Sequence, residues 1–177
     1  KWHHLFQNTP YIIFVASLDT YCQKAYDDIT ENIMFRSIES FKFMVNLRHF
    51  RYHEIILYLN NYNSFINKLS QGFSLSLCFN SNSNPSYVGP QWDSNDTSIN
   101  FNPNYVYNST IDRDAHLDDC RRAAIQFIQE RYKECCPPSK RVYIHTLDIS
   151  NDNDVKRVWW DAKNIIGRRN LARGGIM

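Results

Sequence analysis

Four polar residues follow an apolar run in the middle of the sequence and offer hydrogen-bonding chemistry. The run ends at Leu59 and is followed by Asn60, Asn61, Tyr62 and Asn63. A carboxamide carries both an acceptor oxygen and a donor nitrogen, so three of them in four positions can read the edge of a planar, polar ligand. Asparagine also favours turns, and the four residues could simply lead the chain out of a strand. Both interpretations stay open on the sequence alone.

The other residues of catalytic type do not form a pattern that indicates an enzyme site. The six histidines are not spaced as metal ligands with carboxylates, and no Ser/His/Asp or Cys/His order stands out. The five cysteines are an odd number without metal-like spacing, which predicts reduced thiols in a cytosolic protein. The adjacent Cys135 and Cys136 could suit a metal, but we favour a plain loop. We therefore expect no catalytic residue and no metal ligand in this chain.

The composition is that of a single globular domain. With 177 residues, of which 43% are apolar and 21% charged, the chain can bury one core. A net charge of +2 argues against a nucleic-acid partner. No apolar run approaches the roughly 18 residues that a membrane span needs. The sequence starts with Lys1 rather than methionine, so we expect it to be a piece of a longer protein.

Apolar runs and apolar periodicities alternate along the chain and predict an α/β fold. Runs of strand length occupy residues 10–17, 53–60 and 141–147. Apolar residues at helical spacing predict helices over 29–47, 63–71, 113–134 and 152–171. This alternation implies right-handed crossovers and a parallel sheet with flanking helices on both faces. Ligands of such sheets bind beyond the carboxyl ends of the strands, which is where the residues after Leu59 would lie.

Two apolar patterns predict which side chains form the core. The run at 10–17 is continuously apolar, as is typical of strands buried on both faces of a parallel sheet, and residues 53–60 are predicted to be a second buried strand. The helix over 29–47 has one apolar face, made of Met34, Ile38, Phe41 and Val45. The helix over 152–171 places a second set on one side, for which we expect core packing: Val155, Val158, Trp159, Ala162, Ile165 and Ile166. Residues 79–112 are rich in Asn, Ser and Pro, which predicts a long loop insertion.

Four segments, in the same order, carry a resemblance to a known family. It begins with KWHHLF and IIFVASLDTY, which match the family patterns K-W-x-x-C-F and I-I-F-x-x-x-L-S-x-Y-D. It continues with NIMFRSIESFKFMVNLRHF, which matches N-x-M-x-x-S-L-x-x-F-x-x-I-x-N-x-x-x-F, and ends with VKRVWWDAKNII and NLARGGIM. Except over 79–112, the chain resembles the C-terminal half of the Ras-like GTPase domain of a heterotrimeric G-protein alpha subunit. The resemblance implies the fold of half a P-loop NTPase domain.

The resemblance also implies that the polar residues after Leu59 bind guanine. The family reads the base with an N-K-x-D motif, which falls on residues 60–63, and with a T-C-A-T loop, which falls on residues 147–150. It thereby assigns guanine-binding roles to Asn60, Asn61, Asn63, Ile149 and Ser150. The family's lysine lays its methylene stem along the base. Asn61 stands in its place and is too short for that contact.

Asn63 stands where the family has an aspartate, and this changes the base edge that can be recognised. A carboxylate accepts both donors of guanine, N1–H and the exocyclic amine, in a charge-assisted pair. Asn63 has one acceptor oxygen, and its amide nitrogen would face the guanine amine donor to donor. Each lost charged hydrogen bond costs about 1.5–3 kcal/mol. Xanthine has a carbonyl at C2 that matches the amide, so the sequence predicts that xanthosine triphosphate competes better than GTP.

The parts that hold phosphates and magnesium in the family are not in this sequence. None of its five glycines builds a G-x-x-x-x-G-K-[ST] loop. In the family, the magnesium ligands and catalytic residues lie upstream of the position that matches Lys1. The resemblance therefore implies GTP or GDP with Mg²⁺ in a complete parent protein, where hydrolysis would occur. A half-sheet would leave its first strand's edge unpaired, in keeping with a missing N-terminal half. The alternative is a non-hydrolysing, nucleotide-defective binding module that keeps receptor or partner surfaces.

Two protein partners follow from the same resemblance. The residues that match Lys1 and Trp2 touch the beta-gamma subunits in the family, although Trp2 could equally pack in the core. The last helix and its tail enter a G-protein-coupled receptor, with Leu171, Ile176 and Met177 as apolar anchors. The sequence names no effector. These roles imply a cytoplasmic protein that is peripheral on the inner face of the plasma membrane.

Overall fold

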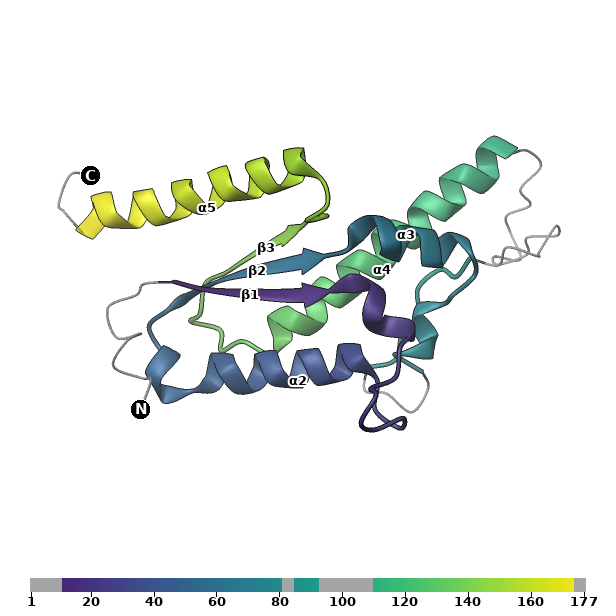
Figure 1. The fold of residues 1–177 in the computed structure, drawn as a ribbon, viewed down its shortest axis with the longest axis horizontal. Helices are drawn as coiled ribbons and strands as arrows, with labels where there is room; N and C mark the ends of the chain where they lie inside the picture. Colours follow the sequence, from purple (N-terminus) through teal and green to yellow (C-terminus); the bar gives the residue numbers. More distant parts are fainter. Residues whose placement is uncertain (1–10, 81–84, 93–109, 174–177) are drawn as a thin grey trace.

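The computed structural model describes residues 11–80, 85–92 and 110–173, with side chains over 11–80, 85–92 and 114–167. Its strands are β1 (Tyr11–Ser17), β2 (Glu54–Asn60) and β3 (Val142–Thr146). Its α-helices are α2 (Ile33–Asn46), α3 (Tyr62–Ser70), α4 (Thr110–Glu134) and α5 (Asp152–Arg173) (Figure 1). Short 3-10 helices span η1 (Leu18–Cys22), η2 (Arg48–Phe50) and η3 (Leu75–Leu77).

The three described strands form one parallel sheet in the order β1-β2-β3. The register pairs Ser17 with Asn60 and Leu59 with Thr146, so the carboxyl ends of the strands meet at one edge of the sheet. The crossovers contain helices, as parallel connections require: α2 joins β1 to β2, while α3 and α4 lie between β2 and β3 (Figure 1). The predicted α/β fold with a parallel sheet and flanking helices is confirmed.

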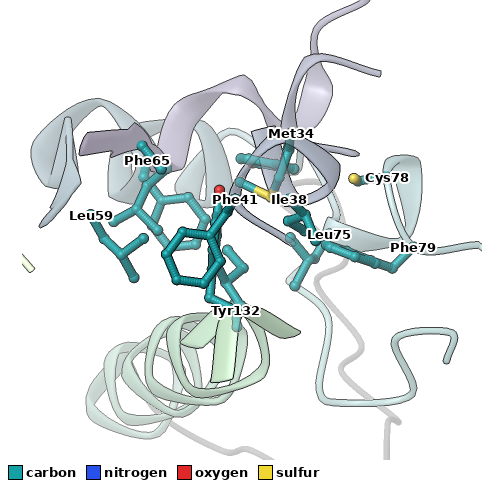
Figure 2. Packing of buried hydrophobic residues seen from close by; sticks show 14 of the residues in the cluster. Met34, Ile38, Phe41, Leu59, Phe65, Leu75, Cys78, Phe79 and Tyr132 are labelled. Atoms are coloured by element: carbon teal, nitrogen blue, oxygen red, sulfur yellow. The ribbon is translucent and has the colours of Figure 1, made fainter. Parts of the chain in front are cut away.

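One face of the sheet, together with α2 and α4, encloses the hydrophobic core. Alternate strand residues point to this face: Ile12, Phe14, Ala16, Ile55, Leu57, Leu59, Val142 and Ile144. The ring centroid of Phe41 lies 5.0 Å from that of Phe14. On its other side it lies 5.2 Å from the ring centroid of Tyr132 of α4 (Figure 2). The predicted apolar face of α2 is confirmed, because its four members are all buried: Met34, Ile38, Phe41 and Val45.

The opposite face of the sheet carries α5 (Figure 1). The hydroxyl of Tyr58 on β2 donates to the carbonyl oxygen of Val158 at 3.5 Å. On β3, His145 Nδ1 lies 3.7 Å from a carboxylate oxygen of Asp161. Burial lowers the pKa of His145 despite this carboxylate, so the ring stays neutral near pH 7. The helix therefore packs over β2 and β3, and it also reaches the start of β1, where the Tyr11 hydroxyl donates to the carbonyl oxygen of Ile165 at 2.9 Å.

The face of β1 on the α5 side is only partly covered. Ile13 and Val15 point to this face and are 49% and 58% exposed. The prediction that residues 10–17 are buried on both faces is therefore wrong. The reason is position in the sheet, since β1 is an edge strand of the described sheet and α5 reaches it at Tyr11, at the start of the strand, while the contacts from Tyr58 and His145 are on β2 and β3. The same prediction is confirmed for β2, where Ile55, Ile56, Leu57 and Leu59 are all buried.

A buried asparagine cap sets the start of α2, which is later than predicted. The helix begins at Ile33, whereas the periodicity extended back to Ile29, and Ile29 is exposed. Asn32 Oδ1 accepts from the backbone N–H of Met34 at 2.8 Å, and its Nδ2 donates to the carbonyl of Tyr21 at 2.6 Å. The cap therefore ends the turn before α2 and joins the helix to η1, an element that the sequence analysis did not predict.

The first part of the predicted loop insertion at 79–112 folds back on the core. Phe79 and Tyr87 are buried, and both rings pack edge-on against Phe127 of α4, at 5.0 Å and 5.2 Å between centroids. Residues 81–84 and 93–109 lie outside the described part of the chain. The last residues of the insertion belong to α4, which begins at Thr110 rather than at the predicted residue 113.

The apolar side predicted for the last helix is only partly buried. Val158 and Ala162 are buried against the sheet, which confirms that part of the prediction. Trp159 is 60% exposed and its neighbour Trp160 is 65% exposed, so the core position expected for Trp159 is wrong. One residue along a helix turns the side chain by about 100°, which takes Trp159 off the line of Val158. Its ring lies under the ammonium group of Lys163, 5.7 Å from the centroid.

Candidate functional site

The loops that follow the three strands meet at one corner of the molecule. The backbone N–H of Leu147 donates to the carbonyl of Leu59 at 3.0 Å, and the N–H of Tyr62 donates to the carbonyl of Leu147 at 3.3 Å. These bonds bring together the residues after β2 and those after β3. The corner holds all five residues predicted to bind the base: Asn60, Asn61, Asn63, Ile149 and Ser150. Their role in binding guanine stays a prediction.

The side chain of Asn60 ties the two loops directly. Its Oδ1 accepts from the backbone N–H of Ile149 at 2.9 Å. Asn60 is the last residue of β2 and is only partly exposed, whereas Ile149 is 64% exposed. With Oδ1 engaged, the Nδ2 donor is the part of this amide that a ligand could meet.

Asp148 is a second link between the loops, and the sequence analysis did not single it out. It is 6% exposed, although it is an acidic residue. Its Oδ1 accepts from the backbone N–H of Ser150 at 3.1 Å and from the Ser150 hydroxyl at 2.5 Å. Its Oδ2 accepts from the backbone N–H of Asn63 at 3.2 Å. These bonds, above all that of the Ser150 hydroxyl, hold the pKa of Asp148 below its usual value.

The side chain of Asn61 is held at the carboxyl end of β1. It lies just before α3 in the left-handed region, with φ of 61° and ψ of 40°, which asparagine tolerates better than most residues. Its Nδ2 donates to Ser17 Oγ at 2.7 Å and to Asp19 Oδ1 at 3.1 Å. α3 itself begins at Tyr62, ahead of the cap predicted at Asn63 or Ser64.

Asp19 is the centre of this second network, at the carboxyl end of β1. Its carboxylate accepts from the hydroxyls of Ser17 at 2.6 Å and Ser64 at 2.8 Å. Lys68 Nζ donates to the backbone carbonyl of Asp19 at 2.7 Å. Partial burial raises the pKa of Asp19, but the hydrogen bonds from Ser17, Ser64 and Asn61 and the charge of Lys68 together lower it. The sequence analysis did not single out this cluster.

The corner can bind a ligand by hydrogen bonds. Two of its carboxylates, Asp19 and Asp148, have pKa values below the usual range and stay ionised at neutral pH. Within the described ranges, no group of three or more His, Cys, Asp or Glu side chains could hold a metal ion. The Nδ2 donor of Asn60 and the exposed side chain of Asn63 suit a planar ligand with several polar atoms.

Most of the predicted partner-binding residues lie outside the described residues. This applies to Lys1, Trp2, Ile176 and Met177. The backbone of Leu171 belongs to the last turns of α5, and its side chain is outside the described set. In the part of the chain that is described, none of the helices combines the length and the apolar character needed to cross a membrane.

Comparisons with known proteins agree with the resemblance seen in the four sequence segments. The profile of the G-protein alpha subunit family matches residues 1–166. The guanine nucleotide-binding protein alpha-7 subunit of Dictyostelium discoideum is 27% identical over 176 residues, which cover 99% of this chain and 37% of the relative. The alpha-17 subunit of Caenorhabditis elegans is 26% identical over 179 residues, covering 100% of this chain and 41% of the relative.

A third relative has higher identity over a shorter match. The guanine nucleotide-binding protein alpha-1 subunit of Caenorhabditis elegans is 39% identical over 160 residues, which cover 89% of this chain and 36% of the relative. The chain thus spans about two-fifths of the length of these relatives, between 36% and 41%. The family profile covers most of the chain, and the parallel α/β fold is that of a portion of such a domain. The chain belongs to the G-protein alpha subunit family.

Proposed function

We propose that this chain supplies the base-binding half of a guanine-nucleotide-binding protein. The observation that carries the proposal is the hydrogen bond between Asn60 and the backbone N–H of Ile149, at 2.9 Å. It joins the two loops that match the family's base-reading motifs, at the carboxyl ends of parallel strands, where ligands of such sheets bind. The phosphate loop, the magnesium ligands and the hydrolytic residues would come from the rest of a complete parent protein. In that protein, bound Mg²⁺ would neutralise phosphate charge.

Within this corner, we assign each predicted residue a part in holding the base. The Nδ2 of Asn60 donates to a ring nitrogen or carbonyl, and the backbone at Ile149 and the hydroxyl of Ser150 face the same edge. Asn63 is exposed and reaches the opposite edge. Asn61 contributes through the corner's shape rather than by covering the base, because its amide donates to Ser17 and Asp19.

The proposed cellular role is that of an alpha subunit in receptor signalling. The C-terminal part of α5 and the tail with Leu171, Ile176 and Met177 would contact a G-protein-coupled receptor. The opening residues Lys1 and Trp2 would contact beta-gamma subunits. The complete protein would act in the cytoplasm at the inner face of the plasma membrane, and its effector is unassigned. Family membership supports these roles.

One observation favours a second candidate, a binding module that no longer controls a nucleotide. The residue at the family's base-covering lysine, Asn61, is fully engaged with Ser17 and Asp19. A base at the corner would therefore have one face without the usual cover. A protein that used only its receptor or partner surfaces would tolerate this change.

Nucleotide competition on the complete protein that contains this chain distinguishes the two candidates. We expect labelled GDP to bind and to be displaced by guanine nucleotides but not by ATP. Asn60→Ala should weaken binding about tenfold, because one hydrogen bond between the base-reading loops and one ligand contact are lost together. The control is Asn67→Ala, since Asn67 is an exposed residue of α3. The absence of nucleotide binding would support the second candidate.

A further inference from the structure

Positive charge gathers at the end of the molecule where the strands begin, opposite the candidate site. We propose that this basic surface, made of Arg48, Arg51, Tyr52, Lys140 and Arg141, docks on the anionic phospholipid headgroups of a membrane. The proposal rests in part on the proposed function, because the receptor contact assigned to α5 is what favours a membrane over other anionic partners. It adds a surface by which the protein lies against the bilayer.

Two connections build the basic surface, and hydrogen bonds join them. The first connection follows α2 and includes η2, and the second runs from the end of α4 to β3. Lys140 Nζ in the second connection donates to the backbone carbonyl of Phe50 in η2 at 2.7 Å. Asn46 Nδ2 at the end of α2 donates to the carbonyl of Cys135 at 3.1 Å. The two connections therefore form one continuous surface.

The η2 turn places two arginines on the same side. The backbone N–H of Arg51 donates to the carbonyl of Arg48 at 3.3 Å, which closes a 3-10 turn. In such a turn, side chains three residues apart lie one above the other. Both arginines are exposed. The guanidinium of Arg51 lies 5.6 Å from the ring centroid of Tyr52, which is 78% exposed.

The basic surface holds more positive charge than the chain as a whole. Residues 47–54 and 135–141 contain four lysines or arginines and one acid, Glu54, whereas the whole chain has a net charge of only +2. The side chain of Glu54 is 15% exposed, and its carboxylate lies 3.8 Å from Arg141. It also accepts from the Tyr143 hydroxyl at 3.2 Å. A partner at this end therefore meets mainly positive charge and must be anionic.

The residue types of the surface suit lipid headgroups. Arginine stays charged at any physiological pH, and its planar fork matches phosphate and carboxylate groups. An anionic headgroup such as that of phosphatidylserine carries both groups. Tyrosine has an apolar body and a polar tip, which is the character of side chains that lie at a membrane interface. Tyr52, exposed beside Arg51, fits this position.

The basic surface lies at the same end of the molecule as the later part of α5. Tyr11 at the start of β1 is paired in register with Glu54, and its hydroxyl donates to the carbonyl of Ile165 in α5 at 2.9 Å. From Ile165 the helix continues to Arg173, about 12 Å further along its axis. Figure 1 shows the C-terminal ends of α2 and α5 at this same end.

This placement favours a membrane as the partner. A receptor is embedded in a membrane, so a protein that reaches it with the end of α5 brings its neighbouring surfaces close to the lipid. The cytoplasmic leaflet is anionic and attracts lysine and arginine side chains near it. The receptor contact and the lipid contact would then be made together, from one end of the protein.

Co-sedimentation of the complete protein that contains this chain with lipid vesicles tests the proposal. The vesicles consist of phosphatidylcholine alone or of an equimolar mixture with phosphatidylserine. We expect tighter binding to the mixed vesicles and weaker binding at high salt, because salt screens exposed charges. Replacing Arg48, Arg51 and Arg141 together by glutamine should weaken binding to the mixed vesicles about 100-fold, because each basic residue near an anionic membrane strengthens binding about fivefold.

The matched control removes the same charge elsewhere. It combines Lys24→Gln, Arg122→Gln and Lys156→Gln, three exposed residues that lie after η1, within α4 and near the start of α5. This variant should bind the mixed vesicles as the wild type does. Equal losses in the two triple variants would mean that only net charge matters, and they would overturn the assignment of the surface.

Two further outcomes overturn the proposal. One is equal binding of the wild type to the two kinds of vesicle. The other is binding of polyglutamate through the three arginines without binding to the mixed vesicles, since the surface would then serve an acidic protein. If the triple variant does not fold, the single substitution Arg51→Gln replaces it, and its binding to the mixed vesicles should be about fivefold weaker.

GDP binding by the same proteins separates this proposal from the proposed function. The arginine variant should bind labelled GDP as the wild type does, because the changed residues lie at the opposite end of the strands from the candidate site. GDP binding without a preference for the mixed vesicles overturns the lipid proposal and leaves the proposed function intact. Arginine-dependent vesicle binding without GDP binding supports the basic surface, while the proposed nucleotide function fails.

Discussion

Lys68 of α3 donates to the backbone carbonyl of Asp19 at 2.7 Å, and its Nζ lies 3.5 Å from Asp19 Oδ2. The two side chains are 22% and 15% exposed, so the contact is largely shielded from water. It fastens the helix after β2 to the turn after β1. The position of the asparagines between β2 and α3 therefore depends on the contact between Lys68 and Asp19.

Replacing this lysine should loosen the corner. Lys68→Met removes a hydrogen bond from a charged donor and should lower the free energy of unfolding by about 1.5–3 kcal/mol. Lys42→Met is the control: Lys42 also faces an acid, Glu39 at 3.5 Å, but its side chain is 57% exposed. Such an exposed pair contributes about 0.5 kcal/mol or less. Urea unfolding measures the loss of stability in each variant. Equal losses would contradict a stabilising role for the contact between Lys68 and Asp19.

Acid should destabilise the protein through Asp19 and Asp148. Both have pKa values below the usual carboxyl range in the folded state. A depressed native pKa gives stability that is fully present above the unfolded value of about 3.9 and is lost as the pH falls toward the native value. Unfolding free energies between pH 7 and pH 3 should therefore fall steadily below about pH 4, and Asp19→Asn should reduce that slope. If Asp19→Asn does not change the pH dependence of the free energy of unfolding, Asp19 does not contribute to the acid destabilisation.

Two phenylalanines of α2 offer a matched test of the core. Phe41 is fully buried between Phe14 and Tyr132, whereas Phe43 is 70% exposed. Phe41→Ala should cost about 3–5 kcal/mol, because it leaves a cavity where a ring was packed. Phe43→Ala should change stability by about 0.5 kcal/mol or less. Denaturant midpoints at unchanged m-value measure both, and comparable losses would show that the packing around Phe41 is wrong.

Because the backbone of Asn61 is left-handed, two substitutions there distinguish the cost of backbone strain from the cost of lost hydrogen bonds. Asn61→Ala and Asn61→Gly both remove the donor to Ser17 and Asp19. At a φ of 61° alanine is strained and glycine is not. The glycine variant should therefore be more stable than the alanine variant by about 1 kcal/mol, as measured by thermal unfolding. The opposite order would mean that the residue leaves this conformation in solution.

The strands, the helices and their order could be predicted because the apolar patterns are strong. Four residues at helical spacing found the face of α2, and a continuous apolar run found β2. The same reasoning failed for Ile13 and Val15, because a sequence does not show which strand is at the edge of a sheet. It also placed Trp159 in the core, since a broad apolar stripe includes residues that the sheet does not reach.

The site could be located but not assembled from the sequence. Asn60 and Asn63 were found from their place after a strand, and they lie at the corner as expected. Asp19 and Asp148 were missed because only part of their hydrogen bonding is local, from Ser17 and Ser150. The rest comes from distant residues: Asp19 meets Lys68, 49 residues away, and Asp148 meets Asn63, 85 residues away. From the sequence alone, an acidic residue is interpreted as a solvated surface charge, because the donors that the fold places around it are not visible.

The two indoles that α5 leaves open to solvent give the protein an intrinsic fluorescent reporter. Trp159 and Trp160 lie next to each other, 60% and 65% exposed, on the helix whose far end is the proposed receptor contact. Indole emission moves to shorter wavelength when water is excluded from the ring. Binding of a partner over this stretch of α5 would thus shift the tryptophan emission of the unlabelled protein to shorter wavelength. Binding confined to the nucleotide corner would leave Trp159 and Trp160 exposed to water and their emission unchanged.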